Sequence, residues 1–488
     1  MTTDFETPEW VHHAVFYQVF PDRFASSPQV PKPHNLEPWD IAPTPFGFKG
    51  GDLVGVTERL DYLQDLGITA IYLTPIFQSA SNHRYHTHDY YQVDPVLGGQ
   101  PAFEKFLNSA HQRGIKVVLD GVFNHASRGF FQFNHILECG TASPYVDWFD
   151  IYGYPLNAYW GKPNYRCWAN LAALPEFNYR NPQVVDFIYG VARHWIEAGI
   201  DGWRLDVPFV FGDDAFWQSF RQVVKTANPQ AYITGEIPED GSRWLQGGQF
   251  DGVMNYLLAY CAWGFFGGEK LDRSLLGNWA THAGPLLSDD TSFFARNVQE
   301  LLVKYPRPAV LAQLNIFDSH DTARLLSLMG HDERRLRLAT LFQMTYPGAP
   351  CIYYGDEIGL EGGQDPDCRR AFPWDERRWN TGLREYFKKL ISLRKQARPL
   401  RDGSFTLLTQ ADGVIAYLRQ WQDQKVVVIL NRNETTLHLD LPVKDHFFEG
   451  DILRDHLSQT ETRFTNGRIA SLTIPPMSGL VLSPGSLC

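Results

Sequence analysis

Two charged residues stand in a stretch that otherwise resembles a buried strand. The stretch runs from Gly199 to Val207, is largely apolar and is bounded by glycines, a pattern typical of a parallel strand with both faces covered. Because Arg204 and Asp206 are two residues apart, their side chains project from the same face of an extended backbone. We expect the guanidinium to keep the carboxyl group ionised. Such a carboxylate is a candidate nucleophile, although a purely structural ion pair would give the same pattern.

Further polar residues follow other predicted strands. Glu236 ends one of them, 30 residues after Asp206, which is about the length of a helix-containing crossover between parallel strands. We therefore expect these two acids on neighbouring strands, and two carboxyl groups facing one bond are the working parts of a glycoside hydrolase. Glu236 has no cation beside it in the sequence, so it could keep a raised pKa and donate a proton. Asp321 would bind sugar hydroxyls and discourage ionisation of Glu236.

The elements that position these residues alternate in type up to about residue 400. Strand character is present at 14–20, 69–73, 116–122, 199–207, 231–235, 252–256, 312–317 and 351–354. Helices are predicted at 53–66, 101–113, 183–198, 214–227, 333–346 and 377–397. About eight βα units favour an α/β fold of the (β/α)₈ TIM barrel type, in which the carboxyl ends of the strands build the active site.

The alternation is interrupted once and then ends. Residues 124–180 are rich in Phe, Tyr, Trp, Asn and Pro without a clear period, which predicts an inserted subdomain after the third strand. The catalytic barrel would then comprise 1–123 and 181–400. From 401 to 488 only short apolar runs occur, which predicts a C-terminal antiparallel β domain.

Composition excludes several classes of partner. The formal net charge is −11 and no basic run is present, so we expect neither nucleic acid nor an anionic membrane as partner. No window has the apolar length of a membrane span. Residues 1–6 lack the basic and apolar regions of a secretory signal. The six cysteines are scattered without a C-x-x-C pair, and Cys488, the last residue, cannot form a prenylation motif. Reduced thiols and a cytoplasmic location are expected.

Four ordered motifs resemble the signature regions of the α-amylase family of retaining glycoside hydrolases. They are Asp120-Gly-Val-Phe-Asn-His125, Gly202-Trp-Arg-Leu-Asp206, Gly235-Glu236 and Ser319-His-Asp321, and a fifth, Leu174-Pro-Glu-Phe-Asn178, falls in the insertion. The resemblance covers nearly the whole chain from Val15. It implies Asp206 as nucleophile, Glu236 as acid/base and Asp321 as transition-state stabiliser. By the same resemblance the sugar ring would be held by Arg204, His125 and His320, and stacked on Tyr85, which could alternatively be a loop anchor.

Within this family the chain is similar to the cyclomaltodextrinase, neopullulanase and maltogenic amylase branch. The similarity lies in residues 15–24, 250–256 and 363–369, and it implies that Asp365 and Arg369 contact the sugar on the non-reducing side, unless they only stabilise a turn. The branch usually carries an N-terminal β-sandwich module, and because this sequence starts almost at the first predicted strand, we expect a member without it. Pro238 replaces a common tryptophan, and residues 207–209 replace common polar ones. We therefore expect a debranching variant that favours α-1,6 links in branched glucans.

Several alternatives stay open at the level of sequence. Mainly α-1,4 cyclomaltodextrinase or neopullulanase activity and 4-α-glucanotransferase activity use the same residues, and a non-catalytic glucan-binding protein is an alternative of another class. An α-glucan or maltooligosaccharide is the expected partner, and the oligomeric state is undetermined. No cofactor is required and no metal site is predicted, since the histidines of 82–89 lack convincing zinc spacing. Structural calcium at Asn124 stays possible through the resemblance.

Overall fold

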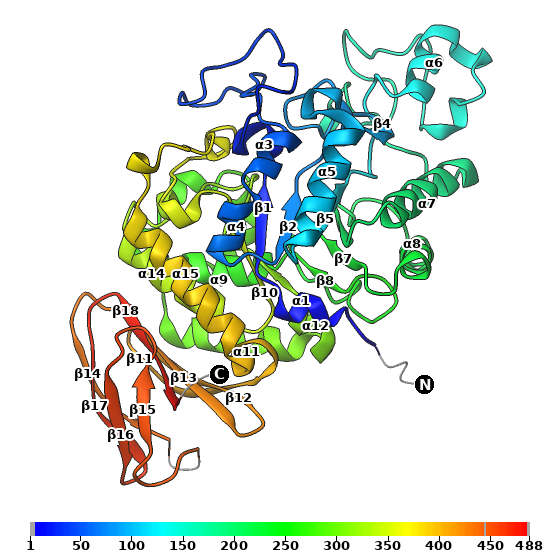
Figure 1. Cartoon of the computed structure of the whole chain (residues 1–488). Helices are drawn as coiled ribbons and strands as arrows, with labels where there is room; N and C mark the ends of the chain where they lie inside the picture. Colours follow the sequence, from blue (N-terminus) through cyan, green and yellow to red (C-terminus); the bar gives the residue numbers. More distant parts are fainter. Residues whose placement is uncertain (1–4, 444–445, 486–488) are drawn as a thin grey trace.

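The computed structural model describes residues 5–443 and 446–485. Residues 1–4, 444–445 and 486–488, and with them the start of the chain and Cys488, lie outside the described part. A ring of eight parallel strands surrounded by helices is followed by a separate antiparallel sheet, coloured orange to red in Figure 1. The predicted fold class, a (β/α)₈ barrel with a C-terminal antiparallel β domain, is confirmed.

The barrel strands pair in the order β8-β7-β6-β5-β2-β1-β10-β9, and a parallel bridge between Met254 and Leu314 closes the ring. The strands are β1 (Phe16–Val19), β2 (Ala70–Leu73), β5 (Lys116–Gly121), β6 (Gly202–Leu205), β7 (Tyr232–Gly235), β8 (Gly252–Val253), β9 (Leu314–Asn315) and β10 (Ala349–Tyr353). Nearly every residue in them is buried, because side chains fill the interior of the ring while helices cover its outside.

Helices cover the outside of the barrel (Figure 1). The longer ones are α3 (Leu53–Glu58), α4 (Leu60–Leu66), α5 (Gly99–Gln112), α7 (Pro182–Glu197), α8 (Asp214–Ala227), α9 (Tyr256–Gly267), α11 (Thr291–Lys304), α14 (Glu333–Thr345) and α15 (Thr381–Gln396). The shorter ones are α1 (Glu9–His13), α2 (Pro21–Phe24), α10 (Trp279–Ala283), α12 (Arg307–Leu311), α13 (Leu325–Leu328) and α16 (Arg398–Asp402). Side-chain caps fix several starts: Asp213, for example, accepts from the Phe216 N–H at the start of α8.

Two excursions build the rim at the carboxyl ends of the strands. After β2 the chain forms the hairpin of β3 (Phe77–Ser79) and β4 (Thr87–Val93). Between β5 and α7 it forms an insertion with α6 (Phe131–Cys139) and short 3₁₀ turns, of which the last is Trp168–Asn170. Backbone bridges join His125 to Glu176 and Cys167 to Pro175, so the insertion folds back onto the end of β5. In Figure 1 it extends outward around α6.

The C-terminal sheet has the order β11-β12-β13-β18-β15-β16-β17-β14. Its strands are β11 (Ser404–Ala411), β12 (Val414–Trp421), β13 (Gln424–Asn431), β14 (Leu437–Pro442), β15 (Ile452–Asp455), β16 (Glu461–Thr465), β17 (Arg468–Ile474) and β18 (Ser478–Pro484). Apolar side chains of β12, β13 and β18, among them Tyr417 and Val428, belong to the same buried cluster as the barrel core. The two parts therefore share a hydrophobic interface.

Several predicted elements differ from the structure. The strand predicted at 252–256 ends at Val253, because the Asn255 side chain accepts from the Leu258 N–H and starts α9 at Tyr256. The strand predicted at 312–317 is only Leu314–Asn315. The helix predicted at 53–66 is broken at Arg59 into α3 and α4. Sequence reasoning missed α9 and α11. Within residues 5–443 and 446–485, every helix is too short or too polar to cross a bilayer.

Candidate active site

Arg204 is the centre of a buried charged cluster. It lies in β6, and its side chain has no exposed surface. Its Nη1 is 2.9 Å from Oδ1 of Asp120 and 3.0 Å from Oδ1 of Asp206, while its Nη2 is 2.7 Å from Oε2 of Glu236. One guanidinium therefore contacts three carboxyl groups that belong to three adjacent strands. The sequence did not indicate the contact with Glu236, since that cation lies beside it in space and not along the chain.

The strand register places these side chains at one level. Asp120 pairs with Arg204 across β5 and β6, and Leu205 pairs with Gly235 across β6 and β7. Asp206 and Glu236 therefore follow paired residues and leave the sheet at the same edge. The Val207 N–H donates to Oε2 of Glu236 at 3.2 Å, and Val207 adopts a φ of 36°. A positive φ is costly for a β-branched residue, so the turn after β6 is strained where it supports Glu236.

Burial dominates the protonation of the central acids. It raises the pKa of Asp206 well above its usual range, although Arg204 opposes this, and the nearby Glu236 raises it further. Burial likewise raises the pKa of Glu236, against Arg204 and with the help of Asp321. Arg204 lowers the pKa of Asp206, as the sequence predicts, but burial and the neighbouring Glu236 together outweigh this effect. The two carboxyl groups influence each other's titration, since the charge of Glu236 raises the pKa of Asp206.

Asp321 has the opposite environment. Burial alone would raise its pKa, but His320, Arg369 and Arg204 together lower it. Nη2 of Arg369 is 3.2 Å from Oδ1 of Asp321, and Nη1 is 2.9 Å from Oδ1 of Asp365. Arg369 thus bridges the two acids, which come from the β9–α13 and β10–α15 connections. Asp321 is the acid in this site that stays ionised most readily.

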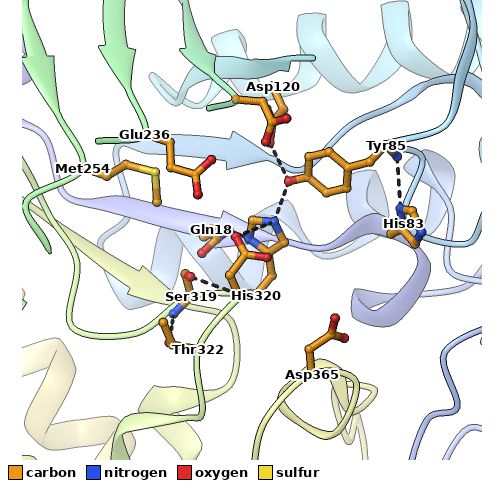
Figure 2. A network of polar contacts seen from close by, with 12 residues as sticks. Gln18, His83, Tyr85, Asp120, Glu236, Met254, Ser319, His320, Thr322 and Asp365 are labelled. Carbon is orange, nitrogen blue, oxygen red and sulfur yellow. Dashed lines mark hydrogen bonds and ion pairs between the residues drawn. The ribbon is translucent and has the colours of Figure 1, made fainter. Parts of the chain in front are cut away.

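Tyr85 is held by a hydrogen-bonded chain under the rim, shown in Figure 2. Its hydroxyl donates to Oδ2 of Asp120 at 2.9 Å and lies 2.5 Å from Nε2 of His320. Nδ1 of His320 lies 2.7 Å from Nε2 of Gln18. The Tyr85 and His320 rings are parallel, with centroids 5.6 Å apart. Burial lowers the pKa of His320 to about 3, although Asp321 opposes this, so the ring is neutral at physiological pH.

The acids border one cavity of about 450 Å³ at the carboxyl ends of the strands. Its lining comprises His83, Tyr85, His86, His125, Trp168, Leu171, Leu174, Asp206, Val207, Phe209, Glu236, Pro238, Asn278, Trp279, His282, Asp321, Asp365 and Arg369. Of the nine predicted site residues, seven are on this wall. The other two, Arg204 and His320, have fully buried side chains, so they contact the carboxyl groups and Tyr85 from behind it.

Sequence reasoning missed the aromatic part of the wall. Trp168 faces His125 in a near-parallel arrangement with centroids 6.2 Å apart. The Trp279 Nε1–H donates to the Asp321 backbone oxygen at 2.7 Å, and its ring stacks on Tyr256. Trp168 could have been sought among the aromatic residues of the insertion. Trp279 lies in a connection whose sequence carries no motif, so only the fold brings it to the site.

Metal ligation is not supported by the donor set. Asn124 is buried, with its Nδ2 3.2 Å from Nδ1 of His125 and its Oδ1 without a hydrogen-bond partner in the structure. Across residues 5–443 and 446–485, no three His, Cys, Asp or Glu side chains converge as a metal site. Calcium takes six to eight oxygen ligands, and Asn124 offers one side-chain oxygen. One side-chain oxygen does not define a calcium site, so structural calcium at Asn124 stays a prediction.

Comparisons with known proteins agree with this geometry. Residues 18–401 match the family model for the alpha amylase catalytic domain, and 405–481 match that for the maltogenic amylase C-terminal domain. Neopullulanase 2 of Thermoactinomyces vulgaris is 43% identical, covering 99% of this chain and 79% of that protein. The debranching enzyme of Nostoc punctiforme superposes with a TM-score of 0.90 at 46% identity, over 99% of this chain and 100% of that one. Cyclic alpha-maltosyl-(1→6)-maltose hydrolase of Arthrobacter globiformis gives 0.86 at 34% identity, over 98% and 100%.

Proposed function

The chain belongs to the α-amylase family of glycoside hydrolases, and from that premise we propose that it is a retaining enzyme that hydrolyses α-1,6 branch links of α-glucans in preference to α-1,4 links. The observation that carries the proposal is the cluster around Arg204, which brings Asp206 and Glu236 to the wall of one cavity. The family membership confirms the resemblance drawn from the sequence motifs, and action on α-glucans follows from it.

The environments of Glu236 and Asp321 support their roles, and Arg204 stabilises the ionised form of Asp206 that the first step uses. Asp206, as nucleophile, attacks the anomeric carbon while the bond from that carbon to the leaving oxygen breaks and Glu236 transfers its proton to that oxygen. Glu236 then takes a proton from water, which attacks the anomeric carbon and releases Asp206. The raised pKa of Glu236 suits the first step. Asp321, whose pKa is lowered, supplies a fixed negative charge beside the oxocarbenium-like transition state.

Four of the six remaining predicted residues line the cavity and would bind the sugar. We assign to Tyr85 and His125, which line the cavity, the stacking and hydrogen bonding of the ring at the scissile bond. Asp365 and Arg369 would contact the next ring on the non-reducing side. Arg204 and His320 are positioning residues in this scheme, because their fully buried side chains orient Asp206, Glu236 and Tyr85.

The acceptor side of the cavity supports the linkage preference. It is lined by Val207, Phe209 and Pro238, which present no hydrogen-bonding side chain to the leaving sugar. An α-1,6 acceptor is joined through an exocyclic carbon and turns its ring away from the cleaved bond, so an open apolar wall suits it. The relatives named as a debranching enzyme and as a maltosyl-(1→6)-maltose hydrolase give independent support.

Two other activities fit the same acids. Mainly α-1,4 hydrolysis, as the name neopullulanase suggests for a relative, needs the same nucleophile and proton donor. A glucanotransferase would use the same covalent intermediate, attacked by a sugar hydroxyl in place of water. A non-catalytic glucan-binding protein is disfavoured, since all three carboxylates are present at the cavity.

Product analysis tests the linkage preference. The purified protein is incubated with glycogen, pullulan and a series of linear maltooligosaccharides, and the products are separated by chromatography, with the Asp206→Asn variant as the blank. We expect linear chains from the branched polymers faster than cleavage of the linear series. Rapid cleavage of the linear series without release of linear chains from the polymers would overturn the preference. A concentrated acceptor sugar then distinguishes transfer from hydrolysis.

The cytoplasmic location stays a prediction, which cell fractionation checks.

A further inference from the structure

A second cavity of about 360 Å³ lies beyond the wall of the first one. It is a groove between the insertion and the segment that leads from β6 into α8, and we refer to it as the Phe209 groove. The residues used below are Asp150, Asn178 and Arg180 from one side, and Phe209, Phe211 and Asp213 from the other. None of the acids proposed for catalysis lines it.

Phe209 joins the groove to the catalytic cavity, because it lines both. It lies three residues after Asp206, on the strained turn that follows β6, and 38% of its surface is exposed. Its neighbour Phe211 is buried and stacks on Tyr179 with centroids 4.6 Å apart. Phe211 is therefore packed against the insertion, while Phe209 itself stays accessible. A ligand that leaves the catalytic cavity past Phe209 enters the groove directly.

The groove combines the two kinds of group that a sugar chain contacts. The Phe209 ring offers an apolar face, on which the C–H face of a pyranose can pack. Arg180 has 79% of its side chain exposed and forms an ion pair with Asp150. Its Nε donates to Oδ1 of Asn178 at 3.2 Å, so the guanidinium is held in place across the groove wall. Asp213 is exposed, and one of its oxygens caps α8. The planar guanidinium of Arg180 and the carboxyl group of Asp213 are suited to form hydrogen bonds with pairs of sugar hydroxyls.

The structure of a branch point offers a ligand for such a second site. The glucose at a branch carries three glycosidic bonds: C6 bears the side chain that is cleaved off, and C1 and C4 continue the main chain. When the side chain occupies the catalytic cavity, the main chain must leave the acceptor position in two directions. A linear α-1,4 substrate leaves in one. An additional groove beside the acceptor position can therefore bind a part of the main chain that a linear substrate lacks.

We propose that the Phe209 groove binds the α-1,4-linked main chain of a branched glucan, with Phe209 as the stacking surface at its entrance and Arg180 as the main hydrogen-bond donor within it. This rests on the proposed function, because it names where the rest of the α-1,6-linked substrate lies. The groove then makes the enzyme select branch links that sit within a main chain over those at its end.

Two substrates that differ only in the main chain test the proposal: a maltosyl branch on maltohexaose and the same branch on maltose. For each enzyme we measure kcat/KM on both substrates and take the ratio of the long to the short main chain. We expect the wild type to prefer the long one. In Arg180→Ala the ratio should fall about fivefold to tenfold, the effect of losing one charge-assisted hydrogen bond, with the change mainly in KM. Phe209→Ala should lower it in the same direction.

Arg377→Ala is the matched control. Arg377 is also an exposed arginine, 2.6 Å from Oδ2 of Asp375, but it borders neither cavity, and its replacement should leave the ratio at the wild-type value. If the wild type cleaves both substrates and neither Arg180→Ala nor Phe209→Ala changes the ratio, the groove does not bind the main chain. If the wild type cleaves neither substrate but hydrolyses linear maltooligosaccharides, the proposed α-1,6 function itself is wrong. The two failures are thus distinguished.

Discussion

At the scale of single residues, the site contains carboxyl groups whose ionised form is made less favourable by burial. Arg204 contacts Asp120, Asp206 and Glu236, and burial raises the pKa of all three acids. Asp321, which Arg369 and His320 contact, has a lowered pKa instead. The folded protein therefore destabilises the ionised form of the two acids proposed to react and stabilises the ionised form of the acid proposed to stay charged.

Replacing Asp206 and Asp321 by asparagine should change stability in opposite directions at pH 7. The folded-state pKa of Asp206 is raised, so its carboxyl lowers stability as pH rises from about 4, the unfolded value, through the folded pKa. Asp206→Asn should therefore raise the Tm at pH 7 by about 2 °C, and the gain should vanish towards pH 4. The folded pKa of Asp321 is lowered, so its carboxyl stabilises above pH ~4. Asp321→Asn should lower the Tm at pH 7, and the loss should shrink as pH falls through the folded pKa.

Thermal unfolding at several pH values measures both effects. Asp367→Asn is a suitable control, because Asp367 pairs with Arg370 outside the catalytic cavity. Shifts of the same sign for Asp206→Asn and Asp321→Asn would contradict the environments described for these acids.

Much of the site could be predicted from single residues and their spacing. The contacts that could not be predicted depend on the tertiary structure. The spacing of Arg204 and Asp206 predicted their contact, and the distance to Glu236 along the chain predicted a neighbouring strand. The contact of Glu236 with Arg204 depends on the register of β6 against β7, which no local pattern specifies. For the same reason, the presence of Arg204 near Asp206 in the sequence did not reveal how deeply Asp206 is buried. That burial raises the pKa of Asp206, where the sequence predicted an ionised group. Trp279 lies at the cavity because it contacts Asp321 and Tyr256, and the sequence around Trp279 does not predict these contacts.

At the scale of elements, β8 and β9 are the shortest strands of the barrel, and they are neighbours in the closed ring. Each has two residues, and the bridge from Met254 to Leu314 joins them. Side chains reinforce this seam: Nδ2 of Asn255 donates to Oδ1 of Asn315 at 2.9 Å, and Nδ2 of Asn315 donates to the Pro347 oxygen at 2.8 Å. These strands are short because side-chain hydrogen bonds replace part of the ladder. That is also why their predicted lengths were wrong, since hydrophobic runs report burial and do not show where pairing stops.

Asn315→Ala should therefore destabilise the protein by about 2 kcal/mol, because it leaves a buried donor of Asn255 and the Pro347 carbonyl without partners. Asn297→Ala provides the comparison: its Nδ2 bonds only to the Phe293 oxygen within its own helix. Urea unfolding of both variants measures the difference. Equal stability of the two variants would show that the seam does not depend on these amides.

At the scale of the whole molecule, the barrel core extends onto the C-terminal sheet, which also has a separate buried cluster of its own. Arg419 of β12 is fully buried and donates to the backbone oxygens of Thr345 at the end of α14, of Ser404 at 3.0 Å and of Gly403 at 3.2 Å. The hydroxyls of Thr345 and Tyr417 lie 2.5 Å apart across the same interface. The apolar runs predicted the β domain, but its attachment could not be foreseen, because a buried arginine beside carbonyl groups has no sequence pattern.

We expect the two parts to unfold together. Arg419→Met keeps much of the side-chain volume but removes the donor to three carbonyl groups, of which Gly403 keeps a second donor in Arg307. It should therefore lower the Tm of a single calorimetric transition by several degrees. Arg463, an exposed residue of β16, should be replaceable by methionine without such a loss. Two separate transitions in the wild type or in Arg419→Met would mean that the β domain folds independently.

The identity of the nucleophile is the central claim, and covalent trapping tests it most directly. The protein is incubated with a fluorinated maltosyl fluoride, whose glycosyl intermediate hydrolyses slowly, and the labelled peptide is identified by mass spectrometry. We predict one maltosyl adduct, on Asp206, and none in the Asp206→Asn variant. An adduct on Glu236 or Asp321, or turnover that inverts the anomeric configuration without any adduct, would contradict the mechanism.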